Sequence, residues 1–161
     1  MLEIAGIGKE RLQLRWVSSA EGQLFADYVT ELTELIRGAG PLDRQRLKIP
    51  LAAVERALEA PALRWLMGME KQLTEVENVF HEKLDPHYYQ IVLQQTAAEE
   101  YQKALLFEDL KEGPKTVRQM AADTGLPVYT VSLRLNDLER SGQADMHGHE
   151  GASPRFRLTV A

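Results

Sequence analysis

The chain has 161 residues, of which 44% are hydrophobic and 27% charged, and its net charge is −5. This composition is typical of a soluble globular protein with one or two domains. No apolar run approaches the ~18 residues of a membrane-spanning helix, and the N-terminus lacks the pattern of a secretory signal, so we expect a cytoplasmic protein. The absence of cysteine excludes disulfides and thiolate-bound iron–sulfur clusters within this polypeptide.

A strand is predicted for residues 11–17. Polar and apolar residues alternate there, and Leu12, Leu14 and Trp16 share one face, which is the pattern of a half-buried strand. A single strand cannot satisfy its own backbone hydrogen bonds. We therefore expect Leu12–Val17 to pair with a second copy of the chain across a two-fold axis, or with another subunit.

A helix is predicted to follow this strand. Ser18 and Glu21 have the spacing of a capping box, with which a helix begins. The sequence of residues 38–41, Gly-Ala-Gly-Pro, ends the helix because glycine favours the C-terminal cap and proline cannot continue it. Apolar residues recur at helical spacing between these points and are expected to face inward: Phe25, Val29, Leu32 and Ile36.

Two helices are predicted after a charged connector. Pro50 and Pro61 stand where a proline of the first helical turn would stand, which predicts a short helix near 51–60 and a longer one near 62–84. The longer helix carries an apolar stripe that we expect to pack, in a dimer, against its symmetry mate: Met69, Leu73, Val76 and Phe80.

A further helix is predicted from Pro86 towards Leu110. Asp85 is a suitable N-cap, and Pro86 suits the first helical position. The residues expected to face inward are Tyr88, Val92, Tyr101 and Leu105.

The last third of the chain has shorter predicted elements. A helix capped by Thr116 closes at Gly125, and a second helix from Val128 to Ser141 follows the turn Leu126-Pro127. Two strands, 143–146 and 155–160, flank the glycine-rich loop 147–154. The second helix is expected to bury Val131, Leu135 and Leu138.

The segment from Thr116 to Gly142 resembles the helix-turn-helix of bacterial winged-helix proteins. The matching residues are Ala121, Gly125, Val131-Ser132, Leu135 and the run from Leu138 to Gly142, Leu-Glu-Arg-Ser-Gly. The resemblance implies that residues from about Gln95 to Ala161 form a winged helix-turn-helix domain with a two-stranded wing. Such a domain is a binding module and not a catalytic one.

A domain of this kind binds either DNA or protein. Leu133 stands where DNA-reading relatives more often carry a polar or basic residue, and residues 97–161 hold ten acidic and eight basic side chains. Because phosphate contacts drive most nucleic-acid affinity, both features favour protein contact. The residues that would form the partner or nucleic-acid surface are Tyr129, Thr130, Ser132, Leu133, Arg134, His149 and Arg155.

The N-terminal segment carries a second resemblance. Residues 10–22, Glu-Arg-Leu-Gln-Leu-Arg-Trp-Val-Ser-Ser-Ala-Glu-Gly, continue through Phe25-Ala26 to residues 38–42. This stretch is similar to the tail of the delta subunit of methyl-viologen-reducing hydrogenase. The resemblance implies association with heterodisulfide reductase-like complexes, in which the delta subunit carries an iron–sulfur cluster and relays electrons.

The chain departs from that family in one respect. The cysteine-bearing part of the family lies upstream of the strand, and this chain has no cysteine, so the cluster is not carried over. Two explanations stay open: a degenerate or split relative that docks with such a complex, or a fragment of a longer protein.

No residue pattern predicts catalysis, a cofactor or a metal. The spacings provide no Ser-His-Asp arrangement, phosphate-binding glycine loop or paired catalytic carboxylates. His147 and His149 lie near Glu150, but structural zinc sites usually take four well-placed ligands with cysteine prominent, so we interpret these histidines as solvated loop residues.

The sequence thus predicts a mainly α (α+β) fold in three parts: a strand-helix unit at 1–42, a helical linker or dimerisation region at 43–94, and a winged helix-turn-helix domain at 95–161. The leading hypothesis is a non-catalytic accessory or assembly subunit of a hydrogenase- or heterodisulfide reductase-linked electron-transfer complex, with the winged helix as a protein-interaction surface. The alternative is a dimeric winged-helix transcriptional regulator that binds DNA. A homodimer is expected in both cases.

Overall fold

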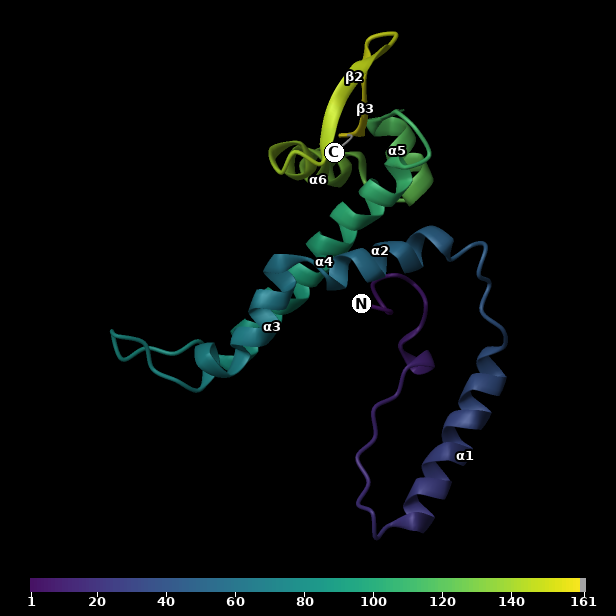
Figure 1. Cartoon of the computed structure of the whole chain (residues 1–161), viewed down its shortest axis with the longest axis vertical. Helices are drawn as coiled ribbons and strands as arrows, with labels where there is room; N and C mark the ends of the chain where they lie inside the picture. Colours follow the sequence, from purple (N-terminus) through teal and green to yellow (C-terminus); the bar gives the residue numbers. More distant parts are fainter. Residues whose placement is uncertain (160–161) are drawn as a thin grey trace. The chain divides into compact units, whose positions relative to one another are not determined.

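The computed structural model describes residues 1–159 and divides the chain into two compact units, residues 2–48 and the residues from Ile49 onward. Helices make up most of the structure, and a three-stranded antiparallel sheet lies near the C-terminus (Figure 1). The expected mainly helical α+β fold is therefore confirmed at this level. Among the described residues, no helix is both long and apolar enough to cross a membrane.

The N-terminal unit contains a 3-10 helix, η1 (Lys9–Arg11), and one α-helix, α1 (Gly22–Ala39). The strand predicted at 11–17 does not form within the single chain, because the segment between η1 and α1 has no regular secondary structure there. Its expected pairing with a second copy stays a prediction. A strand needs a neighbour for its backbone hydrogen bonds. The sheet of the described residues is built from other segments and offers none here.

Helix α1 begins and ends close to the predicted positions. The N–H group of Ser18 donates to Oε2 of Glu21 at 2.7 Å, and Glu21 is the N-cap residue. At the other end Gly40 has a φ of 66°, a left-handed conformation that glycine adopts without strain. The expected burial of the apolar face is wrong, since no residue of α1 is buried, and Phe25 is 58% exposed.

The second unit begins with two helices, α2 (Lys48–Leu58) and α3 (Pro61–Thr74). The long helix predicted for 62–84 therefore stops at Thr74. The side-chain oxygen of Asn78 accepts hydrogen bonds from the N–H groups of Phe80 and Glu82, at 2.8 and 3.1 Å. Such side-chain bonds compete with helix formation. Phe80 is 76% exposed, so the predicted helical stripe Met69–Phe80 does not form.

Helix α4 (Pro86–Leu110) follows, and Asp85 caps it by accepting a hydrogen bond from the N–H of Tyr88 at 2.9 Å. Tyr101 is buried as expected, but the prediction for Tyr88 is wrong, because this ring is 55% exposed. Its neighbour Tyr89 is buried instead. The Tyr89 hydroxyl donates to the carbonyl of Leu66 at 3.0 Å, because α3 packs against that side of α4.

The C-terminal elements are β1 (Lys115–Thr116), α5 (Val117–Thr124), α6 (Val128–Arg140), β2 (Ala144–Glu150) and β3 (Ser153–Leu158). The strands pair in the order β1-β3-β2, and all neighbours are antiparallel. The short strand β1 was not predicted. The predicted loop 147–154 is also wrong, since β2 runs to Glu150 and only Gly151 and Ala152 connect it to β3. Val160, the last residue of the predicted second strand, lies outside the described residues.

One apolar core joins α4, α5, α6 and the sheet. The three residues predicted to face inward from α6, Val131, Leu135 and Leu138, are each no more than 2% exposed, which confirms that prediction. The remaining buried members of this core are Leu106, Leu110, Met120, Ala144 and Phe156.

Leu138→Ala is expected to lower the free energy of unfolding by about 2–5 kcal/mol, because it removes a fully buried side chain and leaves a cavity. Leu133→Ala on the same helix is the matched control. Leu133 is 41% exposed, so its loss is expected to cost less than about 0.5 kcal/mol. Chemical denaturation followed by circular dichroism measures both values. Equal effects of the two variants would contradict the orientation of α6.

Candidate protein-interaction surface

Local sequence signals set the position of α6. Oγ1 of Thr116 accepts from the N–H of Gln119 at 3.3 Å, and Oε1 of Gln119 accepts from the N–H of Thr116 at 2.8 Å, so a complete capping box begins α5. Gly125 ends α5 with a φ of 72°, which is a left-handed C-cap. The turn through Pro127 then begins α6.

The side of α6 opposite the core is uncovered in the described chain. Tyr129 is 77% exposed, and Leu133 lies one helical turn further along. Thr130, another residue predicted for the surface, is half-buried. We refer to the exposed residues of the first two turns as the α6 outer face: Val128, Tyr129, Ser132 and Leu133.

Arg134 does not belong to this outer face. Its side chain is 12% exposed, and its guanidinium donates to Asp137 at 3.0 Å and to Glu99 at 3.4 Å. The first contact is within α6 and the second reaches α4, so Arg134 joins two helices. It is the only basic residue between 128 and 135. Its guanidinium is paired with carboxylates of the same unit and is not offered to a phosphate on the surface.

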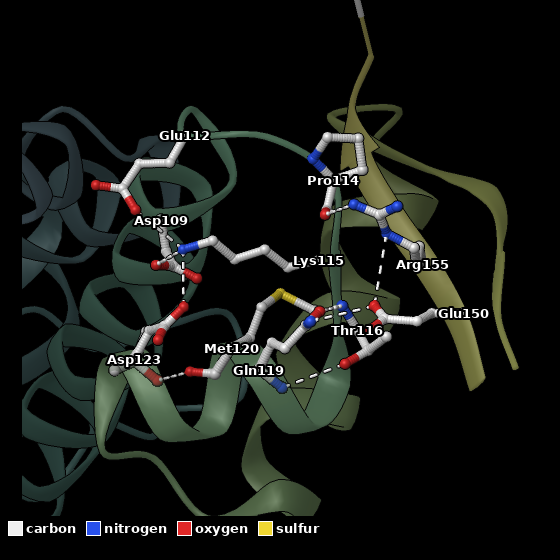
Figure 2. A network of polar contacts seen from close by, with 11 residues as sticks. Asp109, Glu112, Pro114, Lys115, Thr116, Gln119, Met120, Asp123, Glu150 and Arg155 are labelled. Carbon is white, nitrogen blue, oxygen red and sulfur yellow. Dashed lines mark hydrogen bonds and ion pairs between the residues drawn. The ribbon is translucent and has the colours of Figure 1, made fainter.

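The two hairpin residues predicted for the partner surface, His149 and Arg155, differ in their contacts. His149 lies on β2 and is exposed. Arg155 on β3 donates to the carbonyl of Pro114 at 2.6 Å, and its Nε lies 4.0 Å from Oε2 of Glu150 (Figure 2). Arg155 therefore connects β3 to the segment that enters β1.

A largely buried cation, Lys115, lies among three carboxylates. Figure 2 shows the ammonium group of Lys115, a residue of β1, between the three carboxylates. These belong to Asp109 of α4, to Glu112 of the α4–β1 connection and to Asp123 of α5. The distances from Nζ to the three carboxylates are 2.6, 3.1 and 2.8 Å. The Lys115 side chain is 14% exposed and that of Asp109 only 2%. The cluster fixes the end of α4 to β1 and α5.

Burial and the neighbouring charges shift the pKa values of Lys115 and Asp109 in opposite directions. Burial alone lowers the pKa of Lys115, but hydrogen bonds to Asp109, Asp123 and Glu112 raise it above its ordinary value. Burial raises the pKa of the Asp109 carboxyl, and the hydrogen bond from Lys115 opposes that effect. Oδ2 of Asp109 is buried without a hydrogen-bond partner, so Lys115 is the main compensation for this carboxylate.

A groove of about 560 Å³ lies between the α2–α3 connection, α4 and α6. The basic side chains that line the groove already contact other groups of the protein. Arg56 donates to Gln143 at 2.6 Å and stacks on the ring of Phe107 at 3.3 Å, while Lys103 contacts Glu100 at 2.7 Å. The groove therefore gives no specific indication of a ligand.

The described residues hold no group of three or more His, Asp or Glu side chains that could bind a metal. His147 and His149, predicted to be loop residues, lie on strand β2, and both are exposed.

Sequence reasoning missed the Lys115 cluster and the role of Arg155. Their partners are distant in the chain or lie on an unpredicted strand, so no fixed spacing signals them. One available signal was Lys115 between two acidic positions, Glu112 and Asp123, close to a predicted helix cap.

No family model, curated protein or solved structure matches this chain. The surfaces described above, together with the two sequence resemblances, are therefore the basis for a functional proposal.

Lys115→Met is expected to lower the free energy of unfolding by about 3–5 kcal/mol, because it leaves the buried Asp109 carboxylate without its cation. Lys111→Met is the matched control. Lys111 is 53% exposed and contacts Glu108, so its loss is expected to cost at most about 1 kcal/mol. Urea denaturation at neutral pH compares the two variants, and similar losses would contradict a special role for Lys115.

The contribution of Lys115 is also expected to depend on pH. Since the folded-state pKa lies above the ordinary value of 10.5, the stabilisation is complete below that pH and is lost as the pH rises through the folded-state pKa. The stability difference between the wild type and Lys115→Met should therefore shrink only at strongly alkaline pH. Denaturation curves across the neutral to alkaline range measure it; a difference that falls already near neutrality would contradict the assignment.

Proposed function

We propose that the chain is a non-catalytic accessory or assembly subunit of a hydrogenase- or heterodisulfide reductase-linked electron-transfer complex. In this proposal, residues from α4 onward form a winged helix-turn-helix domain, and the α6 outer face binds a protein partner. The link to a redox complex rests on the resemblance of residues 10–42 to the hydrogenase delta subunit tail.

The order of the C-terminal elements supports a winged helix. A helix, α4, is followed by the short strand β1, the helix pair α5 and α6, and the hairpin β2–β3. In the sheet order β1-β3-β2 the central strand is β3. In this proposal the hairpin β2–β3 is the wing. In such a domain α6 is the helix that a DNA-binding relative would place in the major groove.

The observation that carries the proposal is the combination of an apolar α6 outer face with an occupied Arg134. Nucleic-acid affinity comes largely from basic side chains that neutralise phosphates. Here the cation of the first two turns of α6 contacts Glu99 and Asp137. Tyr129 and Leu133 remain exposed, and aromatic and apolar side chains of this kind are typical anchors of protein interfaces.

The test is binding to purified iron–sulfur or flavin subunits of such a complex, measured by titration. Tyr129→Ala is expected to weaken binding about tenfold or more, because truncation of an aromatic anchor costs over ~1 kcal/mol. Trp65→Ala is the matched control: Trp65 on α3 is an aromatic side chain with 58% exposure, away from α6. Its removal should leave binding unchanged.

The alternative function, a DNA-binding transcriptional regulator, is tested by a mobility-shift assay with duplex DNA at low salt. We expect no shift at micromolar protein. A salt-dependent shift would support the transcriptional regulator and overturn the proposal. Absence of binding to any redox subunit would remove the redox-complex assignment, even if α6 binds another protein.

A further inference from the structure

The N-terminal unit leaves large apolar side chains uncovered between η1 and α1. Leu12, Leu14 and Trp16 are 73, 78 and 84% exposed. These are alternate residues of one segment, so in an extended chain they share a face. Exposed apolar groups of this size, close together in the chain, typically indicate an interaction site.

The backbone of the same segment is free to pair. Within the described residues, no backbone–backbone hydrogen bond involves residues 13–17, and the sheet of the C-terminal unit does not include them. A row of free N–H and C=O groups next to a period-two sequence is a template for addition of another strand.

Contacts with α1 hold this segment in place. The Arg15 guanidinium donates to Glu31 at 3.1 Å and lies 5.3 Å from the centre of the Tyr28 ring. Leu14, Val17 and Phe25 line a groove of about 270 Å³ between the segment and α1. The segment therefore lies against the helix, while Leu12, Leu14 and Trp16 stay more than 70% exposed.

The apolar surface extends beyond the segment. Leu12, Leu14 and Trp16 are continued by apolar residues of α1 that are at least 36% exposed, and a standard interface takes about 800 Å² from each partner. The α1 residues in this surface are Phe25, Val29, Leu32 and Ile36.

We propose that the occupant of this surface is a second copy of the chain, paired antiparallel with residues 12–16 across a two-fold axis centred on Leu14. In this register Leu12 lies opposite Trp16, and Gln13 lies opposite Arg15. Apolar side chains meet apolar ones and polar side chains meet polar ones, because the polarity of the segment is symmetric about Leu14. Self-pairing in this register thus needs no other partner sequence.

The register has a defined geometry. Gln13 of one copy and Arg15 of the other exchange backbone hydrogen bonds, and Leu14 meets its symmetry mate in a non-hydrogen-bonded pair with Cα atoms about 4.5 Å apart. That separation falls within the range of about 4.4–6.8 Å that a disulfide can bridge. This interface involves residues 12–16 and does not depend on the α6 outer face.

Single cysteines in the full, naturally cysteine-free chain test the register. Leu14→Cys is expected to form a covalent dimer under mild oxidation. Leu12→Cys and Trp16→Cys should each cross-link poorly alone, since like positions lie about 13 Å apart along the strands. An equimolar mixture of these two variants should cross-link readily. Leu58→Cys is the control, because Leu58 is a leucine of α2 with 45% exposure.

Charge variants at the two-fold axis provide an independent readout. Leu14→Arg and Leu14→Glu should each weaken the dimer at least tenfold in sedimentation equilibrium, and an equimolar mixture of the two should restore it. A wild-type chain that is monomeric at about 100 µM would overturn the proposal, as would Leu14→Cys that cross-links no faster than Leu58→Cys. Leu12→Cys that cross-links efficiently by itself would overturn the register.

Discussion

The ammonium group of Lys115 lies within 3.1 Å of carboxylates from the end of α4, from the α4–β1 connection and from α5. Without it, the buried Asp109 carboxylate would lack a cation and would lie close to two further carboxylates, Glu112 and Asp123. The cation therefore sets the position of β1 between two helices. Phe156 of β3 pairs with Lys115 across the sheet and enters the core with α6, so the placement of α6 depends on the same contact.

Local signals in the sequence predicted the elements but not their long-range contacts. The Thr116 cap, the Gly125 stop and the spacing of Val131, Leu135 and Leu138 placed α5 and α6 correctly, because caps and periodicity act over a few residues. The same rules failed after Thr74, where the helix ends although the apolar period continues, and at Arg134, whose guanidinium contacts a carboxylate of α4. These outcomes depend on which groups meet in three dimensions.

The two units use their side chains in different ways. In the C-terminal unit, apolar groups fill a core, and cations such as Lys115, Arg134 and Arg155 contact acceptors of the same unit. The exposed face of α6 is consequently apolar and uncharged in its first turns, a combination suited to protein contact. In the N-terminal unit no residue of α1 is buried. Leu12, Leu14 and Trp16 are also more than 70% exposed, which is the physical basis for the proposed pairing of residues 12–16.

The two tryptophans of the chain lie in different units, and both are exposed: Trp16 at 84% and Trp65 at 58%. An exposed indole emits at long wavelength in the folded protein, so unfolding changes its emission little. In the single chain, intrinsic fluorescence is thus a poor probe of unfolding but a sensitive one of new contacts, including the pairing proposed for residues 12–16. Any molecule that covers residues 12–17 moves Trp16 into apolar surroundings and shifts its emission to shorter wavelength, without an attached label.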